Sequence, residues 1–314
     1  MTDRPACAIG VDVGGTKIAA GLVAFPSGEV RARRQIATAP ARGGEAIFAD
    51  VLRLCEELTT AARAQDGRVD GIGIGVCELV DLDGNVVSEN CIAWKNVPVR
   101  ERLSKLAPAC IEADVRAAAL AEAMFGAGRP FKQFLYVTVG TGISCCLVLD
   151  GKPFHGAHGA TGTMASSPLS VVCEHCGHLN HRTLEEIASG PALVARYNQH
   201  HPVEAKTGQA VLAAAVAGAP EAADVVRSAG EALGSSIGLL VNVLDPEAVV
   251  VGGGLGSSDG PFWESFSAST RQHIWSEVHR QLPIVRAATG PDAGLIGAAV
   301  AAWQRLPNLE LLKL

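Results

Sequence analysis

The sequence lacks any run of Lys and Arg residues, and its 26 basic residues are outnumbered by 32 acidic ones, for a formal net charge of −6. Without a basic patch, a nucleic-acid interface is not expected. The acidic balance also disfavours docking on anionic lipid. We therefore expect neither nucleic acid nor a membrane among the partners, and an anionic substrate has to be captured locally, by backbone amides or Mg²⁺.

Targeting and membrane signals are absent as well. The apolar stretch 134–149 contains an internal Gly-Thr-Gly and predicts two strands around a turn, not a membrane span. No signal-peptide pattern precedes the first strand-like segment. The nine cysteines are an odd number, and most lie in apolar contexts typical of small core residues. We expect a reducing, cytoplasmic environment.

The chain has 314 residues, of which 48% are hydrophobic and 18% charged, which is enough for two domains with separate cores. Its 35 glycines are clustered, which indicates loops where backbone approaches a ligand closely. Residues 126–130 break the pattern and are a candidate domain boundary. The periodicity predicts strands at 7–13, 17–23, 29–38, 69–80, 109–113, 134–139, 143–149 and 248–251, and helices at 45–64, 114–125, 184–199, 222–244 and 293–304.

Two strand–turn–strand units divide the chain into similar halves, one around Gly14 and Gly15 and one around 140–142. This repetition favours a duplicated α/β core, although two unrelated α/β domains with glycine turns fit the same pattern. Each turn alone also fits an ordinary hairpin. Together with the glycine run 252–254, they indicate a nucleotide site whose residues are Asp12, Gly14, Gly15, Thr16, Lys17, Gly140, Thr141, Gly142, Gly253 and Gly254.

Seven stretches in order resemble the ROK family of bacterial sugar kinases: IGVDVGGTKIAAGLV, GIGIGVCELVDLDG, ADVRAAALAE, VGTGISCCLVLDGKPFHGAHGATG, LEEIASG, NVLDPEAVVVGGGL and AGLIGAAVAAW. The resemblance implies an α/β, actin-like ATPase (ribonuclease H-like) duplicated fold, with two domains and an interdomain cleft that holds ATP with the sugar deeper inside. We expect a small domain of residues 1–112 plus 293–314, a large domain of residues 113–292, and a homodimer.

In this family an Asp at the start of an Ala-rich helix deprotonates the sugar hydroxyl, and Asp114 occupies that position. A carboxylate at a helix N-terminus is stabilised as the anion. It can accept a proton while the hydroxyl attacks the γ-phosphate of ATP. The alternative is that Asp114 only caps the N-terminus of the helix and has no catalytic role. Asp12 is expected to hold Mg²⁺ through water.

The sugar-binding positions depart from the family pattern. Family glucokinases have Asn where this chain has Ala113, and a Glu and a His where it has Thr163 and Ser166. Glu185 keeps the family's sugar-binding identity, and Glu78 replaces a glycine near the expected sugar. These substrate residues, with Asp114, lead us to expect a hexose other than glucose. An aminohexose whose ammonium pairs with Glu78 is one candidate, although a position of Glu78 at the rim fits equally well.

The family carries a zinc loop where this chain has Cys173-Glu-His-Cys176-Gly-His178-Leu-Asn-His181. Two of the family's ligands are replaced here, by Ser166 and Thr183. Cys-x-x-Cys with nearby histidines suits tetrahedral Zn²⁺. We expect a structural zinc bound by Cys173, Cys176 and two of the three nearby histidines, of which His178 and His181 are the expected ligands. The alternative is a degenerate loop without metal.

The function expected from these features is ATP-dependent phosphorylation of the 6-hydroxyl of a hexose, with ATP and Mg²⁺ as cofactors. Polyphosphate as phosphoryl donor stays open. The alternative is a catalytically weak sugar-binding or regulatory ROK protein. ROK repressors carry a helix-turn-helix domain before the first strand, and a first strand at about Cys7 leaves no room for one in this sequence.

Overall fold

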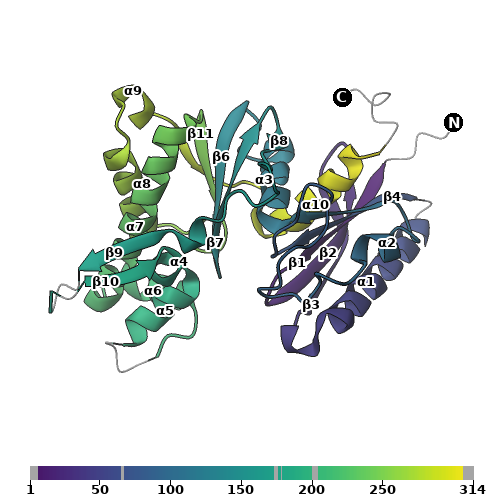
Figure 1. The fold of residues 1–314 in the computed structure, drawn as a ribbon, viewed down its shortest axis with the longest axis horizontal. Helices are drawn as coiled ribbons and strands as arrows, with labels where there is room; N and C mark the ends of the chain where they lie inside the picture. Colours follow the sequence, from purple (N-terminus) through teal and green to yellow (C-terminus); the bar gives the residue numbers. More distant parts are fainter. Residues whose placement is uncertain (1–5, 65–66, 173–175, 178, 200–203, 307–314) are drawn as a thin grey trace. The chain divides into compact units, whose positions relative to one another are not determined.

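The structure is a computed structural model that describes residues 6–64, 67–172, 176–177, 179–199 and 204–306. The chain forms two compact units, each drawn in Figure 1. Unit 1 comprises residues 1–130, 148–161 and 288–314, and unit 2 comprises residues 131–147 and 162–287. Each unit is built on one five-stranded mixed sheet.

Unit 1 has the strand order β3-β2-β1-β4-β5. Strands β1, β2 and β3 form an antiparallel meander, and β4 and β5 run parallel to β1 on its other side. Its elements are β1 (Cys7–Val13), β2 (Lys17–Ala24), β3 (Glu29–Ala37), the 3₁₀ turn Pro40–Arg42, α1 (Gly44–Ala64), β4 (Val69–Val76), α2 (Val99–Leu103), β5 (Ala109–Ala113), α3 (Asp114–Phe125), β8 (Lys152–Pro153), the 3₁₀ turn Gly290–Asp292 and α10 (Ala293–Gln304).

Helices α1 and α10 cover opposite faces of this sheet, because successive residues of a strand point to opposite sides. The odd-numbered apolar residues of β1 pack into the core with α1. On the other face, glycines let α10 approach the sheet directly. A Cβ at Gly10 or Gly73 would lie 1.8 or 1.7 Å from a carbonyl oxygen of α10, and one at Gly297 would lie 1.6 Å from a carbonyl of α3. The sheet, α3 and α10 are therefore in backbone contact.

The sheet of unit 2 has the strand order β12-β11-β6-β7-β8, with β11 parallel to both β6 and β12. Its edge strand β8 falls within residues 148–161, which are grouped with unit 1. The core of unit 2 lies between the sheet and the paired helices α7 and α8. Its elements are β6 (Gln133–Val139), β7 (Ile143–Leu149), the 3₁₀ turn Met164–Ser166, β9 (Pro168–Val172), β10 (Leu179–Thr183), α4 (Glu185–Ala188), α5 (Gly190–Asn198), α6 (Gly208–Val216), α7 (Pro220–Leu244), β11 (Ala248–Gly252), α8 (Pro261–His273), α9 (Glu277–Arg280) and β12 (Ile284–Arg286).

The two sheets repeat one topology, since β6, β7, β8, β11 and β12 follow the same order as β1, β2, β3, β4 and β5. The expected duplicated α/β fold is thereby confirmed. Two predicted elements are wrong in detail. The strand expected at 69–80 ends at Val76, and the helix expected at 184–199 is broken at Ser189, whose hydroxyl accepts a hydrogen bond from the amide of Ala192 and starts a new helix there.

Among the described residues, no single helix is long and apolar enough to cross a membrane. Helices α6 and α7 meet that test only as a pair, with a bend of 115° between them.

The backbone contact between β4 and α10 predicts a steep cost for any side chain at Gly73. Gly73→Ala places a methyl group against a carbonyl oxygen that cannot move alone, and overpacking of this kind costs about 1–3 kcal/mol of unfolding free energy. Gly75→Ala in the same strand is the matched control, because its Cβ would meet only ordinary contacts of 3.5–3.8 Å. Denaturant unfolding of both variants measures the difference, and equal stability would contradict the packing described here.

Candidate active site

Asp12 lies near the end of β1, directly before a tight turn. The amide of Gly14 donates to the carbonyl of Lys17 (3.0 Å), and the Thr38 hydroxyl donates to the carbonyl of Gly14 (2.6 Å). A Cβ at Gly294 would lie 2.6 Å from the Asp12 carboxyl carbon, so the first turn of α10 rests on this carboxylate. Gly14 and Gly15 are half-buried, while Thr16 and Lys17 are exposed. The backbone of the Gly14–Gly15 turn is thus accessible to solvent next to the carboxylate of Asp12.

Burial raises the pKa of Asp12 to about 6, while the positive charge of Lys17 opposes the shift and the negative charge of Asp292 adds to it. Two carboxyl groups near each other in a partly buried place favour protonation or a cation. The residues present therefore fit Mg²⁺, with Asp12 as the group that would hold it.

Asp114 is the first residue of α3 and follows the buried Ala113 at the end of β5. The amide of Val115 donates to Asp114 Oδ1 at 2.6 Å, which fixes the orientation of the carboxyl group. Burial raises the pKa of Asp114 to about 7, and the negative charges of Asp12 and Glu78 add to the shift. A carboxyl group that titrates near neutral pH matches what a general base needs.

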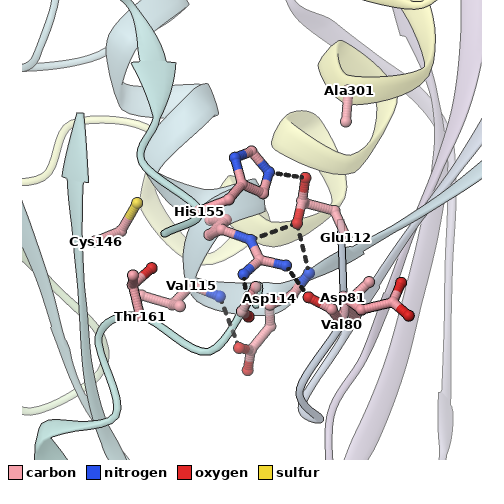
Figure 2. A network of polar contacts seen from close by, with 12 residues as sticks. Val80, Asp81, Glu112, Asp114, Val115, Cys146, His155, Thr161 and Ala301 are labelled. Atoms are coloured by element: carbon pink, nitrogen blue, oxygen red, sulfur yellow. Dashed lines mark hydrogen bonds and ion pairs between the residues drawn. The ribbon is translucent and has the colours of Figure 1, made fainter. Parts of the chain in front are cut away.

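A buried ion pair frames Asp114 two residues away on either side (Figure 2). Glu112 and Arg116 are each 2% exposed, and the guanidinium also donates to the carbonyls of Gly159 (2.7 Å) and Val80 (2.8 Å). His155 Nε2 lies 3.1 Å from the second oxygen of Glu112. The network therefore connects the N-terminus of α3 to the segments that follow β4 and β8.

The same partners explain the titration of Glu112. Burial is the largest influence and acts to raise its pKa, but the hydrogen bond from His155 and the charge of Arg116 outweigh it and lower the pKa to about 2. Glu112 is thus held ionised beside Asp114. The sequence contained one signal of this network, an acid and an arginine four residues apart, but its other partners are distant in sequence.

Glu78 is 5% exposed, and its carboxylate is saturated. The amides of Asn90 (2.9 Å) and Ile92 (2.8 Å) donate to it, as do the Cys91 amide and the Ser88 hydroxyl. Glu78 therefore anchors the loop 88–92, and its burial is compensated by four donors. Pairing of Glu78 with a sugar ammonium stays a prediction, and it requires one of these donors to leave.

In unit 2, the predicted glycine turns lie together. The amide of Gly190 donates to the carbonyl of Gly140 (2.8 Å), which brings the start of α5 to the turn after β6. A Cβ at Gly253 would lie 2.4 Å from the carbonyl of Val139, so the turn after β11 also packs on β6. Gly208, at the start of α6, would meet Gly190 at 3.0 Å. The result is a surface of bare backbone and helix N-termini, which suits a phosphate-bearing ligand.

Glu185 belongs to this same group in unit 2. Its Oε2 accepts a hydrogen bond from the amide of Ile143 (3.0 Å), and a Cβ at Gly142 would lie 2.8 Å from that oxygen. Thr163 and Ser166 are exposed, and the Ser166 hydroxyl reaches the carbonyl of Thr163 at 3.4 Å. The structure thus brings Glu185 to the Gly140–Gly142 turn, while the contacts at Ser166 are local.

The predicted zinc ligands Cys173 and His178 lie outside the described residues. Of the other two, Cys176 is exposed, and His181 Nδ1 in β10 lies 3.3 Å from the Ser170 hydroxyl. The structural zinc stays a prediction.

A five-stranded sheet occurring twice with one topology, each copy carrying a glycine turn after its first strand, is the arrangement of the actin-like fold. Comparison with known proteins narrows the class: the model of the ROK family matches residues 8–305, and the chain belongs to this family.

Three relatives cover 95–99% of this chain at 28–31% identity. The glucokinase of Halalkalibacterium halodurans is 28% identical over 99% of this chain and 98% of its own. A ROK family glucokinase from Streptomyces griseus, solved in complex with glucose and AMPPNP, has a TM-score of 0.80 at 28% identity, covering 95% of this chain and 100% of that one. A ROK hexokinase from Thermus thermophilus has a TM-score of 0.77 at 31% identity, covering 95% and 98%.

The raised pKa values of Asp12 and Asp114 predict how stability changes with pH. A carboxyl group whose pKa is higher in the folded than in the unfolded state binds its proton more tightly when folded, so its contribution to stability is present at low pH and is lost as pH rises. For Asp114 the loss falls between its unfolded pKa near 3.8 and its folded pKa of about 7. Asp114→Asn removes this loss and stabilises the protein at alkaline pH by at most a few kcal/mol, since one pKa unit is about 1.4 kcal/mol.

Thermal unfolding of the wild type and Asp114→Asn, from about pH 4.5 to about pH 8, measures this effect. The two curves are expected to separate as pH rises, with the variant the more stable. Parallel curves would contradict the raised pKa of Asp114.

Proposed function

We propose that this protein is an ATP-dependent kinase that phosphorylates the 6-hydroxyl of a hexose, with Asp114 as the catalytic base. The observation that carries the proposal is the carboxyl group of Asp114, oriented by the Val115 amide and titrating at about pH 7. Membership of the ROK family and the complex of a relative with glucose and AMPPNP support it.

In the proposed reaction Asp114 accepts the proton of the sugar hydroxyl as the oxygen attacks the γ-phosphorus of ATP, and ADP leaves. Mg²⁺, when bound, supplies positive charge to the phosphate oxygens, and Asp12 is the residue that would hold it. The bare backbone of Gly140–Gly142, Gly253 and Gly254 would bind nucleotide phosphate and ribose. The ion pair of Glu112 and Arg116 keeps Asp114 at the start of α3.

The identity of the hexose is inferred from substitutions at the expected sugar-binding positions. Family glucokinases bind sugar hydroxyls with an Asn and a Glu at the positions that Ala113 and Thr163 occupy here. Their replacement favours a hexose that differs from glucose at one or more positions. Since Glu78 is committed to its own loop, an aminohexose has no designated partner there. The regulatory alternative rests on the same two substitutions. It is disfavoured because Asp114, Asp12 and the glycine turns are all retained.

Asp114→Asn tests the base. The amide keeps the shape of the carboxyl group but cannot take a proton, so kcat falls by about 10²–10⁴-fold while the Kd for sugar changes little. A coupled assay for ADP with a panel of hexoses measures kcat, and calorimetry measures sugar binding. The wild-type kcat/KM should also rise with pH and level off above about pH 7, where Asp114 is ionised.

Asp70→Asn is the control, because Asp70 is a half-buried carboxylate of the same unit that pairs with the exposed Arg68. Its kcat should match the wild type. Turnover of Asp114→Asn close to the wild-type value would remove Asp114 as the base.

Glu78→Gln tests whether this residue anchors the loop or contacts the sugar. Replacing one carboxylate oxygen with an NH₂ group removes the acceptor from two of the four donors, which lowers Tm and raises KM for every sugar by a similar factor. A panel of glucose, mannose, fructose, N-acetylated and free amino sugars measures the ranking. Selective loss of amino-sugar phosphorylation would instead restore the ammonium pairing.

A further inference from the structure

Two thiols and a carboxylate form a cluster in unit 1 that the proposed reaction does not use. The Sγ atoms of Cys77 and Cys91 and a carboxylate oxygen of Glu78 all lie within 4.8 Å of one another. Cys77 follows β4 and is fixed by its backbone, whose amide donates to the carbonyl of Val13 at 3.1 Å. Cys77 is half-buried and Cys91 is exposed, so the cluster is open to solvent ions on one side.

The loop 88–92 is what holds the second thiol in place. Glu78 accepts hydrogen bonds from the amides of Cys91 and Ile92. Because Glu78 directly follows Cys77 in the chain, these bonds hold the backbone of Cys91 near Cys77. The Cys91 Sγ also lies 3.5 Å from where a Cβ of Gly15 would be. The fold therefore brings the two thiols together next to the Gly14–Gly15 turn.

The ligand atoms of this cluster suit a soft cation. Cys77 and Cys91 are both free cysteines, and together with Glu78 they place two sulfur atoms and one oxygen within 4.8 Å of one another. Two sulfur ligands select soft or borderline metals such as Zn²⁺ over Mg²⁺.

We propose that Cys77 and Cys91, with an oxygen of Glu78, form a binding site for a soft divalent cation such as Zn²⁺ or Cd²⁺. Both sulfurs bind as thiolates, and their two protons are released to solvent. Glu78 frees one acceptor position when the Ser88 hydroxyl rotates away, because that donor is a side chain while the other three are backbone amides. Water completes four-coordination. None of these residues belongs to the cysteine–histidine loop 173–181 of unit 2.

An ion bound there would lie beside the Gly14–Gly15 turn, because Cys91 Sγ packs against Gly15, so occupancy is expected to slow phosphoryl transfer reversibly. This consequence rests on the proposed kinase function, whereas binding itself does not.

Titration of the full-length protein with Cd²⁺ tests the site directly, because cadmium–thiolate bonds give a charge-transfer band in the ultraviolet. The protein is reduced, freed of metal with chelator, and carries Cys173→Ser and Cys176→Ser so that the other cysteine pair is silent. One equivalent of Cd²⁺ is expected to saturate the band. Adding Cys91→Ser, which changes an exposed side chain, should weaken binding by at least about 10–100-fold. Adding Cys55→Ser, at a buried cysteine elsewhere in unit 1, should leave it unchanged.

Absence of the band, or a band unaffected by Cys91→Ser, would overturn the site. A Cys77–Cys91 disulfide found by mass spectrometry in the metal-free protein under air would overturn the assignment of the pair to a cation. Enzyme assays with Zn²⁺ and then chelator are read separately, so a protein without kinase activity would refute the proposed function and leave the cadmium result standing.

Discussion

The buried ion pair of Glu112 and Arg116 constrains the position of Asp114. Each member is almost fully removed from water, where an unpaired charge is costly, and removing one partner of such a pair typically costs about 3–5 kcal/mol. Arg116 spends its remaining donors on the carbonyls of Val80 and Gly159, so three chain segments meet at one guanidinium. Because Asp114 lies between the two in sequence, at the first position of α3, its carboxyl group has little freedom to move.

A second constraint is steric. The sheet of unit 1, α3 and α10 meet through glycines at Gly10, Gly73 and Gly297, where no side chain fits. Gly294 extends the same contact to the carboxyl group of Asp12. This packing leaves Asp12 and Asp114 partly buried, and desolvation raises both pKa values. The negative charge of Asp12 adds to the shift of Asp114, and that of Asp292 adds to the shift of Asp12. The titration expected of a base thus arises from the way the core is packed.

The sequence predicted the elements whose patterns are local. Strands β1, β5 and β7 and helices α3 and α10 match their predicted bounds, because an apolar strand ending in a turn and an Ala-rich apolar run are both short-range signals. The hairpin of β9 and β10 and the helices α6 and α8 carried weaker signals and were not predicted. The role of Glu78 could not be inferred, since its donors come from a loop ten or more residues away, and the contacts of Arg116 with Val80 and Gly159 are longer-range still.

The most direct test of the central claim is to identify the product. Wild-type protein, ATP, Mg²⁺ and each hexose of a panel are incubated together, and the products are followed by ³¹P NMR. At least one hexose is expected to give a sugar 6-phosphate in equal amount to ADP, with neither product formed when that sugar is omitted. ADP release that is independent of sugar, or no phosphorylated sugar across the panel, would contradict it.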